Sequence, residues 1–508
     1  SLLYAVYTGA EAGLVLVTAD DPGLFSSQNE QDNRWYSRLA KIPTFEPCDS
    51  QEAKDYVKLA FEMSEKFDTP CLIHSVMRVS HCKSVVELGE RTENTKVLEK
   101  FPRNLPKYNC TAMYARVMHA RIEENIKKIA EYVETCGINR VEMRDTKMGI
   151  ICTGVMYAYI KDVFPNASVL KLGMSYPLPQ NMIKDFASKV DKVYVIEELD
   201  PVIEEQVKSM GVDCVGKELF PACYELLPDR LLDICLENGI LKDDPRTHDV
   251  KEVENLPGRN PVLCAGCPHR STYYVLKKHD IACAGDIGCY NLGAQPPFEA
   301  QHTMGCMGAS IGQLHGMSLA NLPENRVCTI GDGTFWHSGL PALANMVHNN
   351  GRGVVILMDN DNTAMTGHQD NPATDYRVLR NVEATKIDIP AVCRAMGVEL
   401  VKTVNAFDVN EVEAGLKECM AYDKVSVLIT KGECVQFNKF SSTPYTVEAD
   451  KCIACQTCFK CGCPAIMVSD EENPKTYKKK CRIDPTLCNG CGICSQVCPV
   501  KAIVKKED

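Results

Sequence analysis

The chain has 508 residues, of which 45% are hydrophobic and 24% are charged, and its formal net charge is −11. This length is too great for one hydrophobic core, so we predict three or four domains. The negative charge argues against nucleic acid as the main partner. No apolar run reaches the ~20 residues of a membrane-spanning helix, and no secretory signal is visible. We therefore expect a cytoplasmic protein that binds neither a membrane nor nucleic acid.

The first 105 residues predict an α/β domain. Short apolar runs at residues 14–17 and 70–74 indicate strands, and the apolar spacing at residues 53–67 indicates a helix. Alternation of this kind is typical of an α/β layer fold. Because the opening residues run into the first strand without a lead-in, we predict that residues 1–105 are an N-terminally truncated domain.

Two further α/β segments follow in the chain. A charged helical pattern at residues 106–145 predicts a connector helix. A second α/β domain is predicted at residues 146–250 from three strands separated by helices, at residues 148–153, 168–171 and 192–196. After a polar, proline-containing boundary, strands and helices alternate again over residues 255–440.

A cysteine-rich tail at residues 445–508 predicts a small iron–sulfur domain. Ten of the 28 cysteines lie between Cys452 and Cys498. The run Cys-x2-Cys-x2-Cys-x3-Cys-Pro is typical of bacterial ferredoxins, in which three thiolates bind one [4Fe-4S] cluster and the fourth binds the other. The tail contains this run and a second copy with one extra spacer residue. We therefore predict two [4Fe-4S] clusters, one held by Cys452, Cys455, Cys458 and Cys498, the other by Cys488, Cys491, Cys494 and Cys463.

Two neighbouring cysteines leave an alternative open. Cys461 could replace Cys463 as the fourth ligand, because of the extra spacer residue, whereas Cys481 is expected to be a spectator. Zinc is disfavoured, since zinc sites use separated pairs of ligands rather than two triple runs.

A diphosphate and metal site is predicted in residues 255–440. Residues 326–330 indicate a buried strand, Gly331-Asp332-Gly333-Thr334 its turn, residues 335–349 a helix and residues 354–358 the next strand. Glycines at a helix N-terminus expose main-chain N–H groups to a diphosphate. Asp332 and Asn360 follow adjacent parallel strands, so both can bind one Mg²⁺. A lone Gly-Asp-Gly would indicate only a turn, but its spacing from Asn360 matches the thiamine-diphosphate motif.

Two cysteine-containing loops of the same segment hold further candidate residues. Their members are Cys264, Gly266, Cys267 and His269 in the first loop and Asp286, Ile287, Gly288 and Cys289 in the second. Taken alone, Cys264, Cys267 and His269 would suit a zinc site or ordinary packing.

Together these motifs resemble the 2-oxoacid:ferredoxin oxidoreductases over the whole chain, and most closely the large (alpha) subunit of the indolepyruvate type. The sequences of three segments, at residues 19–23, 26–32 and 197–201, are similar to those of that subunit. Gly333 and Trp336 depart from it, because Ser and Phe are expected at these positions.

The resemblance implies an α/β fold of several doubly wound, thiamine-enzyme-type domains plus a small ferredoxin-like domain. Residues 1–105 would be a pyrimidine-binding-type domain, 146–250 a transketolase C-terminal-like domain, 255–440 the thiamine-diphosphate-binding domain and 445–508 a 2[4Fe-4S] domain. The resemblance also implies that both cysteine-containing loops line the thiamine pocket. The main-chain carbonyl of Asn362 would complete the Mg²⁺ ligands, and His269 is our candidate for proton handling.

The implied activity is oxidative decarboxylation of an aryl pyruvate, with coenzyme A as co-substrate and ferredoxin as electron acceptor. The family works as a heteromer with a smaller beta (gamma-type) subunit. Its activating glutamate is expected upstream of Ser1. One rival, a non-oxidative thiamine enzyme, leaves the cysteines unexplained. Another rival, an electron-transfer subunit with scaffold α/β domains, leaves Asp332 and Asn360 unexplained. A different 2-oxoacid substrate within the same family also stays open.

Overall fold

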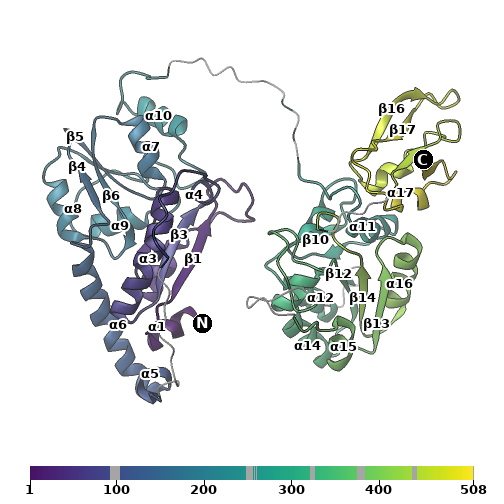
Figure 1. Ribbon diagram of the computed structural model, residues 1–508, viewed down its shortest axis with the longest axis horizontal. Coiled ribbons are helices and arrows are strands. Elements are labelled where there is room, and N and C mark those ends of the chain that lie inside the picture. The colour runs from purple at the N-terminus through teal and green to yellow at the C-terminus, as the bar shows by residue number, and fades with distance from the viewer. Residues whose placement is uncertain are drawn as a thin grey trace. The chain divides into compact units, whose positions relative to one another are not determined.

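The computed structural model describes residues 1–91, 103–246, 260–320, 326–374, 384–437 and 443–506, together with Leu256 and Gly258. The chain forms two compact units, Ser1–Glu252 and Val253–Asp508 (Figure 1). Both units contain parallel strands with helices packed on them, which confirms the predicted α/β class. Among the described residues, no helix is both long and apolar enough to cross a membrane.

The first sheet of the N-terminal unit has the strand order β1-β3-β2-β7, in which β7 is antiparallel to β2 and the other pairs are parallel. Its strands are β1 (Val15–Asp20), β2 (Thr44–Phe45), β3 (Cys71–Val76) and β7 (Met174–Tyr176). The helices of this part are α1 (Leu2–Thr8), α2 (Arg34–Ala40), α3 (Ser50–Phe67), α4 (Met77–Ser80), α5 (Leu105–Tyr108) and α6 (Ala112–Val133). The expected connector helix is α6. It also buries Ile129 and Val133 in the same core as Met63 of α3.

The second sheet of this unit has the order β4-β6-β5-β8. Its strands are β4 (Arg140–Glu142), β5 (Asp145–Thr153), β6 (Ala167–Leu172) and β8 (Val193–Val195), and its helices are α7 (Met156–Val163), α8 (Gln180–Ala187), α9 (Val202–Ser209) and α10 (Pro228–Glu237). Strand β7 lies between β6 and β8 in sequence but pairs with β2 of the first sheet. One strand therefore passes from the second sheet's segment into the first sheet.

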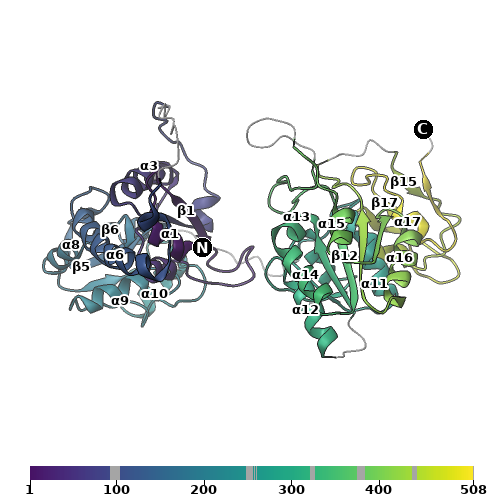
Figure 2. The same ribbon diagram turned by 90° about the horizontal axis from the view of Figure 1, so that it is seen from below.

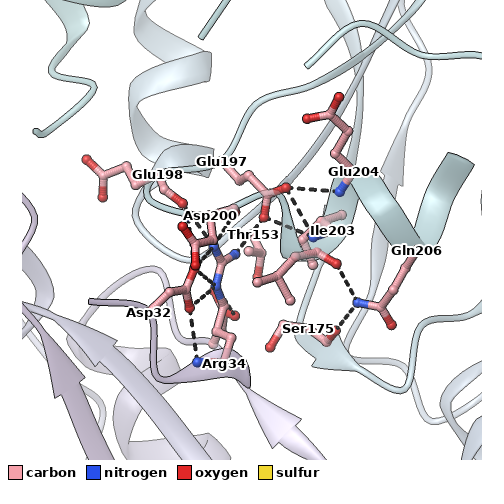
Figure 3. A network of polar contacts seen from close by, with 12 residues as sticks. Asp32, Arg34, Thr153, Ser175, Glu197, Glu198, Asp200, Ile203, Glu204 and Gln206 are labelled. Carbon is pink, nitrogen blue, oxygen red and sulfur yellow. Dashed lines mark hydrogen bonds and ion pairs between the residues drawn. The ribbon is translucent and has the colours of Figure 1, made fainter. Parts of the chain in front are cut away.

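A buried arginine joins the two sheets of this unit (Figure 3). Arg34 of α2 is only 3% exposed. Its guanidinium forms ion pairs with Asp32 at 2.6 Å and with Glu197 at 2.7 Å, and donates a hydrogen bond to the carbonyl of Glu198 at 2.9 Å. Glu197 follows β8, and its carboxylate also accepts from the main-chain N–H groups of Ile203 and Glu204 at the start of α9. One cation thus connects a helix of the first layer to a loop of the second.

The C-terminal unit is built on a six-stranded parallel sheet, in the order β10-β9-β11-β12-β14-β13 (Figure 2). Its strands are β9 (Cys283–Ala284), β10 (Gln301–Thr303), β11 (Val327–Gly331), β12 (Gly353–Asp359), β13 (Leu400–Asn405) and β14 (Val425–Lys431). All seven residues of β12 are buried, as expected for a central strand covered on both faces.

Side chains of β12 alternate between two cores, because successive residues of a strand face opposite sides. Val354, Ile356 and Met358 pack with helices α11 (His269–Lys278) and α16 (Val409–Ala421). Val355 and Leu357 pack with α12 (Ala309–Leu319), α14 (Leu340–His348) and α15 (Ile389–Ala395). The sheet is therefore a buried middle layer, and only its strand ends are free to form a site.

The cysteine-rich tail belongs to the same compact unit as this sheet. It consists of two antiparallel pairs and two short helical turns: β15 (Tyr445–Val447) with β18 (Ile503–Lys505), β16 (Ile466–Glu472) with β17 (Lys479–Ile483), the turn Thr457–Cys461 and α17 (Ile493–Gln496). Its small core contains Ala465, Ile466, Ile483 and Ile503 packed among cysteines.

Removing the buried arginine should destabilise the N-terminal unit. Arg34→Ala leaves Asp32 and Glu197 buried without their cation, which costs about 3–5 kcal/mol in comparable cases. We expect a lower denaturation midpoint in urea, followed by circular dichroism. The matched control is Arg38→Ala, because Arg38 pairs with Glu205 at the surface and such pairs contribute under about 1 kcal/mol. Equal midpoints for the two variants would contradict this role of Arg34.

Candidate active site and metal centres

The candidate metal site lies where two neighbouring strands end. Strands β11 and β12 are parallel and in register, with Gly331 opposite Met358. Asp332 and Asn360 directly follow them and are both buried. The sequence predicted a turn at residues 331–334, but the chain makes no simple turn there. Asp332 begins a helical stretch that runs through α13 (Asp332–Thr334) and a π-helical turn (Phe335–Gly339) into α14.

Polar groups of three residues converge at this strand edge. The side-chain amide of Asn360 faces the carbonyl oxygen of Asn362 at 2.6 Å and Oδ1 of Asp332 at 3.2 Å. With its nitrogen on this side, the amide donates hydrogen bonds to both oxygens; with its oxygen on this side, it offers a third oxygen ligand to a cation. Neighbouring ligands of an octahedral Mg²⁺ stand ~2.9 Å apart. The spacing of the three groups therefore fits the Mg²⁺ site predicted from the sequence when the amide oxygen faces the other two.

The carboxylate of Asp332 needs a positive partner. Burial raises its pKa to about 7, and the nearby Asp359 acts in the same direction. Lys431, the last residue of β14, is bound to Asp359 and Asp361 at 2.8 Å each. A divalent cation between Asp332, Asn360 and Asn362 would supply the missing charge.

A cavity of about 100 Å³ opens beside these oxygens. The expected cofactor residues that line it are His269, Ile287, Gly288, Cys289, Gly331, Asp332, Gly333, Thr334, Asn360 and Asn362. Gly333 has a steric reason to be glycine, because a Cβ there would lie 2.2 Å from Oγ1 of Thr363. A serine, as expected from the family resemblance, would require Thr363 to move.

Four expected cofactor residues lie outside this cavity: Cys264 and Cys267 line a second cavity described below, whereas Asp286 and Gly266 line neither. The carboxylate of Asp286 accepts hydrogen bonds from the main-chain N–H groups of Gly308 at 2.9 Å and Ser310 at 3.0 Å, at the start of α12. Gly266, whose φ is +76°, packs against Asn489 of the tail, where a Cβ would lie 3.0 Å from that residue's Cβ. Asp286 and Gly266 shape their loops, and neither lines this cavity.

A second cavity, of about 270 Å³, is lined by four cysteines: Cys264, Cys267, Cys289 and Cys434. It shares His269, Cys289 and Asn360 with the first cavity. Burial raises the pKa of Cys289 to about 11, and the nearby thiols of Cys434 and Cys264 add to this effect. Four thiols around one space form a ligand set that is suited to a metal centre, which binds thiolates. We call them the cavity cysteines.

Cys434 had not been recognised from the sequence. It lies three residues beyond β14, which pairs with β12. Its main-chain N–H donates to the carbonyl of Asn360 at 3.3 Å. Its position indicates a site residue in the same way as the positions of Asp332 and Asn360, because all three residues with reactive side chains follow an apolar strand.

His269 is a buried neutral base on the wall shared by the two cavities. Burial lowers its pKa to about 4. Its ring lies edge-on to Tyr290, with the centroids 6.0 Å apart. The imidazole is therefore neutral near pH 7, and its role in proton handling stays a prediction.

In the tail, the structure brings together the four cysteines expected to hold one cluster. Cys452, Cys455, Cys458 and Cys498 line one cavity of about 20 Å³. Cys481 lines the same cavity, with its sulfur 3.9 Å from that of Cys452. Cys498 therefore crosses from the second cysteine run to the first, as ferredoxin ligation requires.

The second set of tail cysteines is also close together. Burial raises the pKa of Cys491 to about 11, with Cys463 and Cys488 among the nearby thiols that add to the effect. Cys461 lies beside the same set, since its thiol interacts with those of Cys463 and Cys491. Both candidates for the fourth ligand are thus near Cys491.

Comparisons with known proteins agree with this geometry. The family described as "Thiamine pyrophosphate enzyme, C-terminal TPP binding domain" matches residues 286–430, and "4Fe-4S binding domain" matches residues 482–504. The chain is 37% identical to indolepyruvate oxidoreductase subunit IorA of Pyrococcus horikoshii, over 100% of this chain and 84% of the relative. The identity to IorA of Archaeoglobus fulgidus is 38%, over 98% and 82%.

The chain belongs to the IorA family. The resemblance inferred from the sequence is thereby confirmed, and the chain is an oxidoreductase with a thiamine-diphosphate-binding domain and a 4Fe-4S domain. A shorter match of 62 residues at 40% identity is to pyruvate synthase subunit PorD of Methanothermobacter marburgensis, over 12% of this chain and 64% of the relative.

The metal site of this IorA-family chain can be tested by charge removal. Asp332→Asn should raise the dissociation constant of thiamine diphosphate with Mg²⁺ by at least ~10- to 100-fold, because the cation loses its carboxylate ligand. Isothermal titration calorimetry measures this constant, and the iron content should stay unchanged. The control is Asp361→Asn, which makes the same charge change in the same loop at a residue bound to Lys431. Tight binding by Asp332→Asn would show that the cation is held elsewhere.

Proposed function

We propose that this chain is the thiamine-diphosphate-binding subunit of an enzyme that oxidatively decarboxylates aryl pyruvates to acyl-coenzyme A and reduces ferredoxin. The single observation that carries the proposal is the wall shared by the two cavities. His269, Cys289 and Asn360 line both the oxygen-rich cavity and the four-cysteine cavity. In the proposed enzyme, the decarboxylation centre would therefore lie directly beside the electron acceptor.

The residues that line the oxygen-rich cavity would have different roles. Asp332, Asn360 and Asn362 would hold Mg²⁺, and main-chain N–H groups at the start of the helical stretch after Gly331 would face the diphosphate. The bound thiamine supplies the electron sink for loss of CO₂. His269, buried and neutral, would accept and return a proton on the wall next to the cysteines.

The cavity cysteines would bind a third [4Fe-4S] cluster, in addition to the two expected in the tail. Four thiols around one closed space give the Cys₄ ligand set of such clusters. A Cys₄ zinc site is the other chemistry that this ligand set permits. Iron is favoured because an oxidative reaction needs an electron acceptor at this position, and zinc undergoes no redox change.

The proposed partners follow from the same reaction. The relatives are named as subunits, which supports a heteromer with a smaller beta (gamma-type) subunit. Ferredoxin would accept electrons from the tail, and coenzyme A would accept the acyl group. An electron-transfer subunit without thiamine is the rival function, but it gives no reason for Asp332, Asn360 and Asn362 to line one cavity.

Metal analysis tests the three-cluster assignment. After anaerobic reconstitution we expect about 12 irons per chain, since each cluster contains four. Cys434→Ser should lose about four of them, whereas Cys393→Ser, a buried cysteine in the core on the opposite face of the sheet, should lose none. Plasma emission spectroscopy measures iron and zinc together. About eight irons, or one zinc beside eight irons, would refute iron at the cavity cysteines.

Substrate class is tested with a panel of 2-oxoacids under anaerobic conditions, with the smaller subunit, coenzyme A and a low-potential dye. The kcat/KM for indolepyruvate should exceed that for pyruvate or 2-oxoglutarate by at least about tenfold, a ratio within reach of side-chain recognition. Dye reduction should fall when coenzyme A is omitted. A higher kcat/KM for pyruvate would contradict the aryl specificity and leave the oxidative decarboxylation intact.

A further inference from the structure

Arg270 is a buried cation whose hydrogen-bond acceptors are all uncharged. It lies on α11 with 1% exposure. Its Nε donates to the carbonyl of Cys264 at 2.9 Å and its Nη1 to the carbonyl of Cys461 at 2.9 Å, while Nη2 donates to the carbonyls of Leu263 and Cys264. The guanidinium thus connects the loop of the cavity cysteines to the cysteine-rich tail.

No carboxylate balances this charge. Within the described ranges of the chain, Arg270 forms no ion pair with an Asp or Glu, in contrast to Arg34 with Asp32 and Glu197. A buried charge without a counter-charge costs several kcal/mol. An anion is therefore expected nearby, and the thiolates of a bound cluster would supply it.

The thiols around Arg270 come from two different sets. On one side, the guanidinium donates to the carbonyl of Cys264, and the main-chain N–H of Arg270 donates to the carbonyl of Cys267 at 3.3 Å. On the other side, the guanidinium donates to the carbonyl of Cys461, which packs in the same core as Cys491 of the tail. Arg270 therefore contacts both sides of the junction between the loop and the tail.

A second contact holds the same two segments together. The side-chain amide of Asn489 donates to the carbonyl of Ala265 at 2.6 Å. Asn489 lies directly after Cys488, in the second cysteine run. The cavity cysteines and this run are consequently neighbours, and Arg270 lies at their junction.

We propose that Arg270 is the shared counter-ion of two iron–sulfur clusters, the one held by the cavity cysteines and the one held by Cys488, Cys491, Cys494 and a fourth tail cysteine. This inference rests on the proposed function. Four thiolates outweigh the charge of the iron–sulfur core, so each cluster is an anion that becomes more negative on reduction. Net charge sets the reduction potential of such clusters. Each cluster accepts one electron without a proton, and the fixed guanidinium favours the reduced form of both.

The same geometry leaves one cluster site away from Arg270. The cavity of Cys452, Cys455, Cys458 and Cys498 is not lined by Arg270 or by any residue of its loop. The reduction potential of a cluster held by these four cysteines should therefore not depend on Arg270.

The test is a potentiometric titration of the reconstituted full chain, followed by electron paramagnetic resonance. In Arg270→Gln, the reduction equilibrium of two clusters should become at least tenfold less favourable, which corresponds to ~59 mV for a one-electron couple. The third cluster should keep its potential. Arg270→Lys retains a positive charge, so it should shift the reduction potentials of the two clusters less than Arg270→Gln does. The control Lys479→Gln removes an exposed cation that lines the Cys452 cavity, and solvent screening should make its effect small.

Unchanged potentials in an Arg270→Gln chain with full iron content would overturn the proposal. If the Arg270→Gln chain does not fold, the same titration is carried out on Asn489→Asp. This variant keeps Arg270 and adds a negative charge at the same junction. The same two clusters should then become harder to reduce, and unchanged potentials would again refute the shared counter-ion. A parent chain without iron at the cavity cysteines would instead refute the proposed function.

Discussion

The site of this protein depends on one geometric constraint, which is that parallel strands end at the same edge of a sheet. Strands β11, β12 and β14 are adjacent, so the residues that follow them meet in space. Asp332 and Asn360 bring oxygen atoms to this edge, and Cys434 brings a thiol. The main-chain hydrogen bond from Cys434 to Asn360 joins the two kinds of chemistry. An oxygen-rich cavity and a thiol-rich cavity consequently share a wall.

The two buried arginines show how the surroundings of a charge decide its role. Arg34 lies between the carboxylates of Asp32 and Glu197, so its charge is balanced and its effect is to join two sheets. Arg270 has only carbonyl oxygens as partners, so its charge acts on more distant groups. The first arrangement stabilises the fold of the N-terminal unit. The second directs a positive field toward cysteines on two sides.

Several residues of recognisable motifs have a role in shaping their loops. Asp286 uses its carboxylate on the main-chain N–H groups at the start of α12. Gly266 allows the close approach of Asn489, and Gly333 the close approach of Thr363. A motif therefore includes residues that fix the conformation of a loop as well as residues that line the cavity.

The sequence by itself determined the local features of this protein. Apolar periodicity predicted β5, β11 and β12, and the cysteine spacing predicted the tail clusters, because strand pattern and ligand spacing depend on residues near one another in the chain. Tertiary structure alone decided which distant groups meet. Cys434 joins cysteines more than a hundred positions earlier, and Arg270 reaches the carbonyl of Cys461. Such contacts depend on strand order and helix packing, which no local pattern encodes, and the roles of Cys434 and Arg270 were therefore visible only in the folded chain.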